Sequence, residues 1–459
     1  MNNVCKYFEK IMSIPRPSGK EDKIANCLCE FAKARGLWFS KDKFHNVIIK
    51  KDNGSKKTII LQCHQDMVCV ADAGVNKDFE SDGIDWYVDG DYYKAHGTTL
   101  GADNGIGVAI ILSILDEESK EFPNIEAVFT TQEETTMQGA INLNYDELKG
   151  KTLISLDGIK EGDLESSCAG MCNIELAKKL SEARLDAKDN IYELKIDGLL
   201  GGHSGDDIGK NRLNAIDLLF RLLKGLNATG IVSIEAGKSN NVIPSFANAI
   251  FITKLSENEV NKICNDFECL SEEGGNTPKI YCSLKGAQGK AYELEGATEL
   301  ITTFNHGMIV GNSDGFPILS ENMGAITLKD DTLKIALSIR SSDIKLENKQ
   351  LEIIEKLSKD NGFDFDLVLR KPASPFKEDS ILRKSLAKTY KKLFSKDVEI
   401  KHIHACMEMG MFAKNIKDLD ICTIAPNVYD IHTTSEKVSI SSINRVYDWI
   451  VETLNDFNK

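Results

Sequence analysis

The sequence lacks an excess of positive charge and lacks any long apolar run. Its 459 residues carry a net charge of -14 at pH 7, which argues against the clustered basic face that binding to a nucleic-acid backbone requires. No segment is long and apolar enough to span a bilayer, and the first residues contain no apolar run of the signal-peptide type. We therefore expect a cytoplasmic protein that binds neither nucleic acid nor a membrane.

Two groups of motifs are also missing. The 12 cysteines contain no C-x-x-C pair, which argues against a structural zinc ribbon, and without an export signal we expect reduced, mostly buried thiols. The glycine-rich stretch at residues 101–107, GADNGIG, lacks the G-K-[ST] ending of a phosphate loop and does not complete the Rossmann glycine pattern. The sequence gives no support to nucleotide binding.

The order of the expected elements predicts two domains. Helices alternate with short β-rich runs in residues 1–184 and again in residues 374–459, a pattern typical of an α/β domain with a mixed sheet and helices on both faces. Residues 185–373 show a different order of expected elements, with two successive series of strands and helices. We predict an inserted α+β domain there, composed of two tandem sandwiches.

Potential metal ligands and acid–base groups follow four of the expected strands. In an open α/β sheet, sites form where the carboxyl ends of the strands meet. A further acid, Asp103, stands at the start of a long expected helix, beside a glycine-rich turn. The groups that follow the strands are His64 and Asp66 after residues 58–63, Glu133 and Glu134 after 126–131, Asp157 after 152–156, and His432 after 421–426.

Taken one at a time, these residues have simpler explanations. A lone H-x-D is usually a surface turn, adjacent glutamates usually begin a solvated helix, and Asp103 alone would most often be a helix N-cap. Their joint occurrence favours a mixed nitrogen and oxygen ligand set, which suits zinc, manganese or cobalt. Five candidate ligands, with Asp103 able to bridge, fit two ions roughly 3.5–4 Å apart better than one.

The whole chain resembles the aminoacyl-histidine dipeptidases, also called Xaa-His or cytosol non-specific dipeptidases, within the larger group of two-zinc aminoacylases and carboxypeptidases. The resemblance implies a two-domain metallopeptidase that hydrolyses dipeptides of the Xaa-His type or with broad specificity. The stretches that carry it occur in family order over both domains: IPRPSG, CHQDMVCV, GTTLGADNGIGVA, TTQEETTMQGA, SLDG, GGHSGDDIGKNRLNA, HACMEMGMF and IHTTSEKVSI.

The resemblance also implies roles for the residues at the strand ends. His64 and Asp157 would bind one metal ion, Glu134 and His432 the other, and Asp103 both. The ions would be Zn²⁺, with Mn²⁺ or Co²⁺ as alternatives. Asp66 would orient the imidazole of His64, as carboxylates behind metal ligands do. Glu133 would be the general base for the metal-activated water.

In the inserted domain, the resemblance implies residues that bind the peptide. His203 in GGHSG would stabilise the oxyanion, although a histidine in a glycine-rich turn is otherwise unremarkable. Asn241 and Arg340 would hold the substrate carboxylate, and a surface ion pair is the alternative for Arg340. Glu408 in HACMEMG would bind the free amino terminus, while His404 nearby could pack or bind.

Some positions depart from the family pattern and leave the specificity open. Gly209 stands where many relatives carry a histidine. Ala425-Pro426 and His432-Thr433-Thr434 replace the usual Gly-Pro and His-Ser-Pro elements. The alternatives are a related aminoacylase, tripeptidase or carboxypeptidase, and a non-catalytic peptide-binding protein. The expected partner is a small peptide. The resemblance also implies a second copy of the chain bound through the inserted lid domain, and the alternative is that the tandem repeat covers this surface within one chain.

Overall fold

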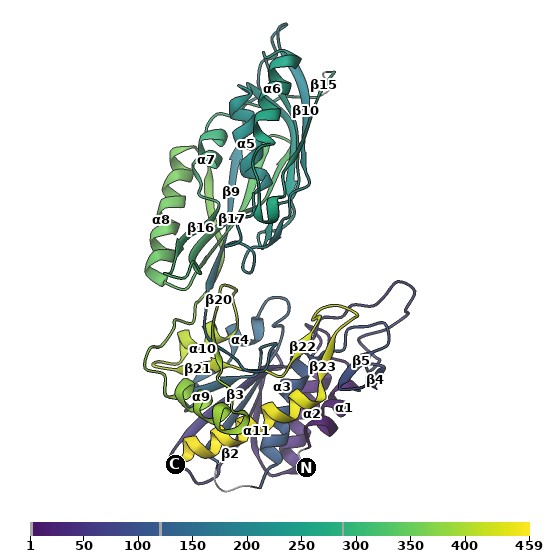
Figure 1. Cartoon of the computed structure of the whole chain (residues 1–459), viewed down its shortest axis with the longest axis vertical. Coiled ribbons are helices and arrows are strands. Elements are labelled where there is room, and N and C mark those ends of the chain that lie inside the picture. The colour runs from purple at the N-terminus through teal and green to yellow at the C-terminus, as the bar shows by residue number, and fades with distance from the viewer. Residues whose placement is uncertain (1–2, 119–121, 287–288) are drawn as a thin grey trace. The chain divides into compact units, whose positions relative to one another are not determined.

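The computed structural model describes residues 3–118, 122–286 and 289–459, which form two compact units (Figure 1). The first unit comprises Met1–Cys168, Ser374–Ile403 and Met407–Lys459, and the second comprises Ala169–Ala373 and His404–Cys406. The sequence placed the first change of domain at residue 185. In the structure, strand β9 (Gly170–Lys179) already belongs to the sheet of the second unit, because it pairs with β18 and β19.

The first unit is built on a mixed eight-stranded sheet, as predicted. Strand β3 pairs in parallel with β6 and β7, and β7 pairs in parallel with β21. Strand β2 pairs antiparallel with both β6 and the edge strand β1. The order across the sheet is β1 (Trp38–Lys41), β2 (Val47–Lys51), β6 (Asn124–Thr130), β3 (Thr58–His64), β7 (Thr152–Ser155), β21 (Asp420–Thr423), β8 (Asp163–Cys168) and β20 (Glu399–Ile403).

Helices cover both faces of this sheet, because its central strands bury side chains on both faces. In β3, Ile59 and Leu61 contact one core and Ile60 contacts another. Five helices pack on the first of these faces: α1 (Val4–Met12), α2 (Asp22–Ala34), α3 (Ala102–Asp116), α9 (Ile381–Phe394) and α11 (Ile440–Asn458). The other core receives Phe412 of α10 (Met409–Asn415), which packs near α4 (Gln138–Asn142).

Smaller elements complete the first unit. A four-stranded sheet has the order β22 (Val428–Tyr429), β23 (Lys437–Ser439), β5 (Tyr92–Ala95) and β4 (Trp86–Asp89), and Tyr145–Glu147 forms a 3₁₀ turn. Helices that combine the length and the apolar character of a membrane-spanning segment are absent from the described residues.

The second unit contains one continuous antiparallel sheet. The two series of elements that the sequence suggested as tandem sandwiches are joined edge to edge, because β12 pairs with β17. The order is β15 (Lys279–Lys285), β10 (Asn190–Asp197), β14 (Ala247–Thr253), β12 (Gly230–Gly237), β17 (Pro317–Lys329), β18 (Thr332–Ser341), β9 and β19 (Asp364–Lys371), with β16 (Gly307–Gly311) paired to β17.

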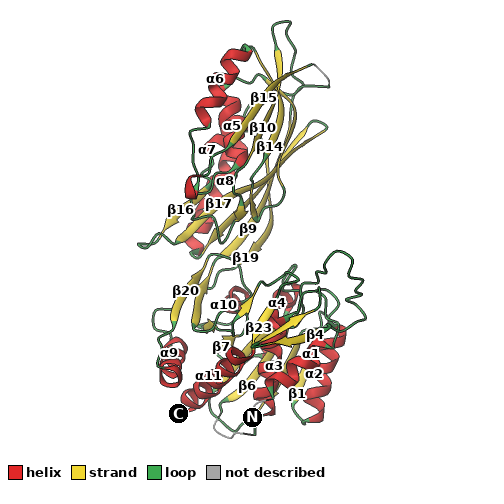
Figure 2. Ribbon diagram, turned by 45° about the vertical axis from the view of Figure 1, so that its right-hand side comes forward, coloured by secondary structure: helices red, strands yellow, loops and turns green. Residues whose placement is uncertain are grey.

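Four helices of the second unit share one apolar core with this sheet (Figure 2). They are α5 (Ala215–Gly225), α6 (Glu257–Phe267), α7 (Ala297–Thr303) and α8 (Ile344–Asp360). A short two-stranded ribbon, β11 (Gly202–His203) with β13 (Val242–Ile243), and a 3₁₀ turn at Glu273–Gly275 complete the unit.

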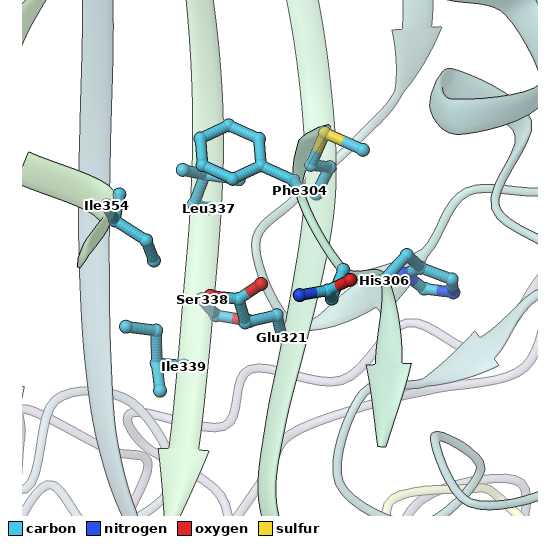
Figure 3. A pocket seen from close by; sticks show the side chains of 9 residues that line it. Phe304, His306, Glu321, Leu337, Ser338, Ile339 and Ile354 are labelled. Atoms are coloured by element: carbon cyan, nitrogen blue, oxygen red, sulfur yellow. The ribbon is translucent and has the colours of Figure 1, made fainter. Parts of the chain in front are cut away.

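A small group of polar side chains interrupts this apolar core (Figure 3). Glu321 on β17 is 5% exposed, and its Oε1 accepts a hydrogen bond from Gln350 of α8. Glu321 and His306 both line a cavity of about 10 Å³, and Glu321 Oε2 and His306 Nε2 have no hydrogen-bond partner among the described residues. Burial raises the pKa of Glu321 to about 7, although the hydrogen bond from Gln350 opposes the shift.

The buried carboxyl predicts a pH dependence of stability. Between the usual pKa of 4.5 and the folded-state pKa of about 7, the unfolded chain releases this proton first, so the free energy of unfolding falls as pH rises. Glu321→Gln removes the titration, and the stability of the variant relative to wild type should rise by about 2–3 kcal/mol from pH 5 to pH 8. Urea unfolding at both pH values measures it. Glu352→Gln, at an exposed position of α8, serves as control, and parallel curves for wild type and Glu321→Gln would contradict the expectation.

Candidate active site

The predicted ligands come together at one edge of the first unit's sheet. His64 is the last residue of β3, Glu134 follows β6, and Asp157 follows β7. Because these three strands run parallel, their carboxyl ends lie at the same edge. Asp103 lies in the first turn of α3, and His432 lies in the loop between β22 and β23.

Asp103 lies between the two histidines. His64 Nε2 is 3.1 Å from Asp103 Oδ1 and 3.2 Å from Asp157 Oδ1. On the other side, His432 Nε2 is 2.9 Å from Glu134 Oε2 and 3.4 Å from Asp103 Oδ2. The ligand atoms of each group of three lie within 4.8 Å of one another. Asp103 thus presents one carboxylate oxygen to each group.

This donor set fits divalent cations of the zinc type. Each group of three combines one imidazole nitrogen with two carboxylate oxygens, the mixed set that zinc, manganese and cobalt accept. Hydrogen bonds with Asp103 and Glu134 raise the pKa of His432 to about 10. Burial would lower the pKa of His64, but Asp157 and the neighbouring acids outweigh it and raise that pKa well above its usual value. The acids therefore strongly favour positive charge at both positions.

Asp66 lies behind His64, and its side chain is fully buried. Its Oδ1 is 3.5 Å from His64 Nδ1, and its two oxygens accept hydrogen bonds from the backbone N–H groups of Glu133 (3.2 Å) and Glu134 (3.3 Å). One carboxylate therefore contacts the imidazole at the end of β3 and holds the turn that follows β6.

Glu133 differs from the adjacent Glu134 in its contacts. One of its oxygens belongs to a group with His64 and Glu134 whose ligand atoms lie within 4.8 Å of one another. No hydrogen bond or ion pair of its carboxylate occurs within the described ranges. Burial raises the pKa of Glu133 well above its usual value, and the charges of Asp157, Glu408 and Glu134 act in the same direction. Such a carboxyl group is suited to exchanging a proton.

The second unit groups three of the predicted substrate-binding residues. His203 ends β11, next to Ser204, whose backbone N–H donates to the carbonyl of Asn241 at 2.9 Å. Arg340 on β18 is 4% exposed, and its Nε donates to Ser204 Oγ at 3.3 Å. Among the described residues no carboxylate pairs with Arg340, so the alternative of a surface ion pair does not hold.

The HACMEMG stretch is divided between the two units. Glu408, in the first unit, is 1% exposed, and its Oε2 accepts hydrogen bonds from Gln62 Nε2 (2.7 Å) and Thr130 Oγ1 (2.5 Å). Burial raises the pKa of Glu408 to about 8. His404, in the second unit, is 4% exposed, and its Nε2 lies 2.7 Å from Ser320 Oγ, so it packs inside that unit.

Several contacts around the ligands were not foreseen from the sequence. Asn104 Nδ2 donates to Asp157 Oδ1 at 3.0 Å, and Glu21 Oε1 accepts from the backbone N–H of Gln132 at 3.0 Å. Arg16 and Glu436 bind the backbone of the ligand-bearing turns. Arg16 and Glu436 stand in the motifs IPRPSG and HTTSEK, but side chains that bind backbone groups leave no pattern of paired residue types in a sequence.

Comparison with known proteins identifies the family. Residues 60–456 match the model of peptidase family M20/M25/M40. The chain belongs to this family. The match confirms the family resemblance, and this M20 protein is a peptide-bond hydrolase rather than a non-catalytic binding protein.

Individual relatives agree with this assignment. The chain is 31% identical to the cytosol non-specific dipeptidase of Escherichia coli (strain K12) over 467 residues, covering 98% of this chain and 96% of that protein. The crystal structure of aminoacylhistidine dipeptidase from Vibrio alginolyticus superposes with a TM-score of 0.89 at 27% identity, over 99% of this chain and 96% of that one. A tripeptidase from Staphylococcus aureus shares the fold, with a TM-score of 0.61 at 15% identity over 99% and 98% of the two chains.

Proposed function

We propose that this M20 peptidase is a cytoplasmic dipeptidase that uses two divalent cations. The observation that carries the proposal is the position of Asp103, which offers one oxygen to His64 and Asp157 and the other to Glu134 and His432. The names of the Escherichia coli and Vibrio alginolyticus relatives support dipeptides, of the Xaa-His type or more broadly, as substrates.

Five side chains would hold the cations. His64 and Asp157 would bind one, Glu134 and His432 the other, and Asp103 both, and this assignment suits zinc, with manganese or cobalt as alternatives. When bound, two such ions polarise the scissile carbonyl and make water a stronger nucleophile.

The proton transfers are assigned to Glu133. Its carboxylate is free of other partners in the described structure and carries a raised pKa, so it can take a proton from the attacking water and deliver it to the leaving amine. Asp66 supports both the proposed metal ligand and the proposed general base, because it lies against His64 and binds the backbone N–H of Glu133.

Four further polar side chains are our candidates for binding the peptide itself. Arg340 is buried without a carboxylate of its own, so its guanidinium is suited to the substrate carboxylate, with Asn241 as a second donor. His203, whose Nδ1 lies 3.1 Å from Asp206 Oδ2, would donate from Nε2 to the developing oxyanion. Glu408 would receive the amino terminus through Oε1, the oxygen left without a partner among the described residues.

A related activity is the rival assignment, because the fold is shared with a tripeptidase. A panel of dipeptides that includes β-alanyl-histidine, tripeptides and N-acylated amino acids separates the possibilities. We expect turnover of dipeptides that stops with chelator and returns with Zn²⁺, and little turnover of the other two classes. Preferred hydrolysis of N-acylated amino acids or of tripeptides would contradict the proposal.

The different roles of Glu133 and Asp103 predict different effects of replacing each with alanine. Glu133→Ala should retain close to two cations per chain and lose about 10²–10⁴-fold or more in kcat, because an acid–base group is removed and this one acts twice. Asp103→Ala should lose cations, because both groups of three lose a ligand. Elemental analysis beside kinetics measures both. The division of roles is wrong if the two variants have the same metal content.

The role of Arg340 predicts a substrate-dependent effect. Arg340→Met should lower kcat/KM about 10–100-fold for dipeptides with a free carboxylate, because a charge-assisted contact is lost. Dipeptide amides, which lack that charge, should be poor substrates for wild type and little affected by the substitution. The control is Arg370→Met on β19, which removes an ion pair with Glu347 of α8. An equal loss on both substrate classes would indicate a structural effect instead.

A further inference from the structure

Two buried charged residues near the ligands have no part in the chemistry above. Arg16, between α1 and α2, is 1% exposed, and Glu436, between His432 and β23, is 3% exposed. Within the described residues neither forms an ion pair of 4.0 Å or less. A buried charge is costly unless hydrogen bonds compensate for it, so their contacts indicate what they do.

Glu436 binds four consecutive backbone N–H groups. Its Oε2 accepts from Leu100 (2.8 Å) and Gly101 (2.9 Å). Its Oε1 accepts from Ala102 (2.7 Å) and from Asp103 itself (3.2 Å). Because Glu436 follows His432 by four residues, this carboxylate ties the loop of one ligand to the turn that presents Asp103.

Arg16 binds the same turn from its carbonyl side. Its Nη1 donates to the backbone carbonyls of Gln65 (3.2 Å) and Asp66 (2.9 Å), directly after His64. Its Nη2 donates to the carbonyl of Gly101, two residues before Asp103. The guanidinium therefore spans the turns of two ligands.

The packing around Arg16 restricts the turn further. Gly101 has φ of 72°, a left-handed conformation, and a Cβ at this position would lie 2.5 Å from Arg16 Nη2. A residue with a side chain would be strained and would displace the guanidinium. Because Gly101 has no side chain, Arg16 can bind a carbonyl of this turn while Glu436 binds its N–H groups.

We propose that Arg16 and Glu436 are positioning residues that set Asp103 between His64 and His432 before any cation binds. They bind no cation in this account, but they determine the affinity of both cation sites, because ligands held in place lose less conformational freedom on binding. The inference rests on the two-cation site proposed above.

Titration of chelator-stripped protein with Zn²⁺, in competition with a chromophoric chelator, tests this inference. In Glu436→Gln, the amide NH₂ replaces one carboxylate oxygen, so the backbone N–H groups that faced this oxygen lose their acceptor. We expect Zn²⁺ to bind this variant at least tenfold more weakly, with an unchanged far-UV spectrum. The matched control is Glu126→Gln. Glu126 is 3% exposed and accepts from the backbone N–H groups of Lys149 and Gly150, but holds no ligand turn, so wild-type affinity is expected.

Two further comparisons separate charge from position. Arg16→Lys keeps the charge but offers a single nitrogen that cannot span both turns, so it should also weaken binding at least tenfold. In the metal-free wild type, the amides of residues 100–103 should exchange with deuterium as slowly as those of Lys149 and Gly150, and this measurement does not depend on any variant folding.

The outcomes are distinguishable. Affinity of Glu436→Gln within twofold of wild type, an equal loss in Glu126→Gln, or fast exchange at residues 100–103 in metal-free protein would each overturn the positioning role of Glu436. Wild-type affinity of Arg16→Lys would overturn the spanning role of Arg16. If wild type itself binds fewer than two Zn²⁺, the proposed function fails instead.

Discussion

The first unit concentrates negative charge at one edge of its sheet. The arrangement depends on positive charge that compensates for these acids. Asp66, Asp103, Glu133, Glu134 and Asp157 lie around two imidazoles, with little exposure to water. Burial raises the pKa of Asp157, and the charges of Asp103 and Glu134 raise it further. Acids this close cannot all ionise in a poorly solvated site unless positive charge lies among them. Divalent cations would supply that charge more completely than protons on the two histidines.

The sheet brings the acids together, and backbone contacts determine how accurately they are placed. Parallel strands bring the turns after β3, β6 and β7 to one edge, where the regular strands end. Buried charged side chains bind the backbone there: Glu21 and Asp66 hold the turn after β6, and Arg16 and Glu436 hold the turn before α3. The energetic cost of burying these charges is offset by hydrogen bonds to backbone dipoles.

Local signals in the sequence were sufficient for much of this description. Polar residues at strand ends, with Asp103 at the start of a helix, predicted the site, and these five candidate ligands lie close together in the structure. The pairing of strands that are distant in the sequence could not be predicted. Strand β9 pairs with strands more than a hundred residues away along the chain, and the pairing of β12 with β17 joins two series of elements into one sheet. Glu408 and His404 are close in sequence but belong to different units, because the chain changes unit between them. Arg16 and Glu436 were missed because their partners are backbone groups.

The central claim is that one aspartate joins two cation sites. Anomalous difference maps from crystals of the zinc-loaded protein, recorded on both sides of the zinc absorption edge, test it most directly. The account predicts two peaks, one beside His64 and Asp157 and one beside Glu134 and His432, with an Asp103 oxygen directed at each. A single peak, or two peaks that do not share Asp103, would contradict it.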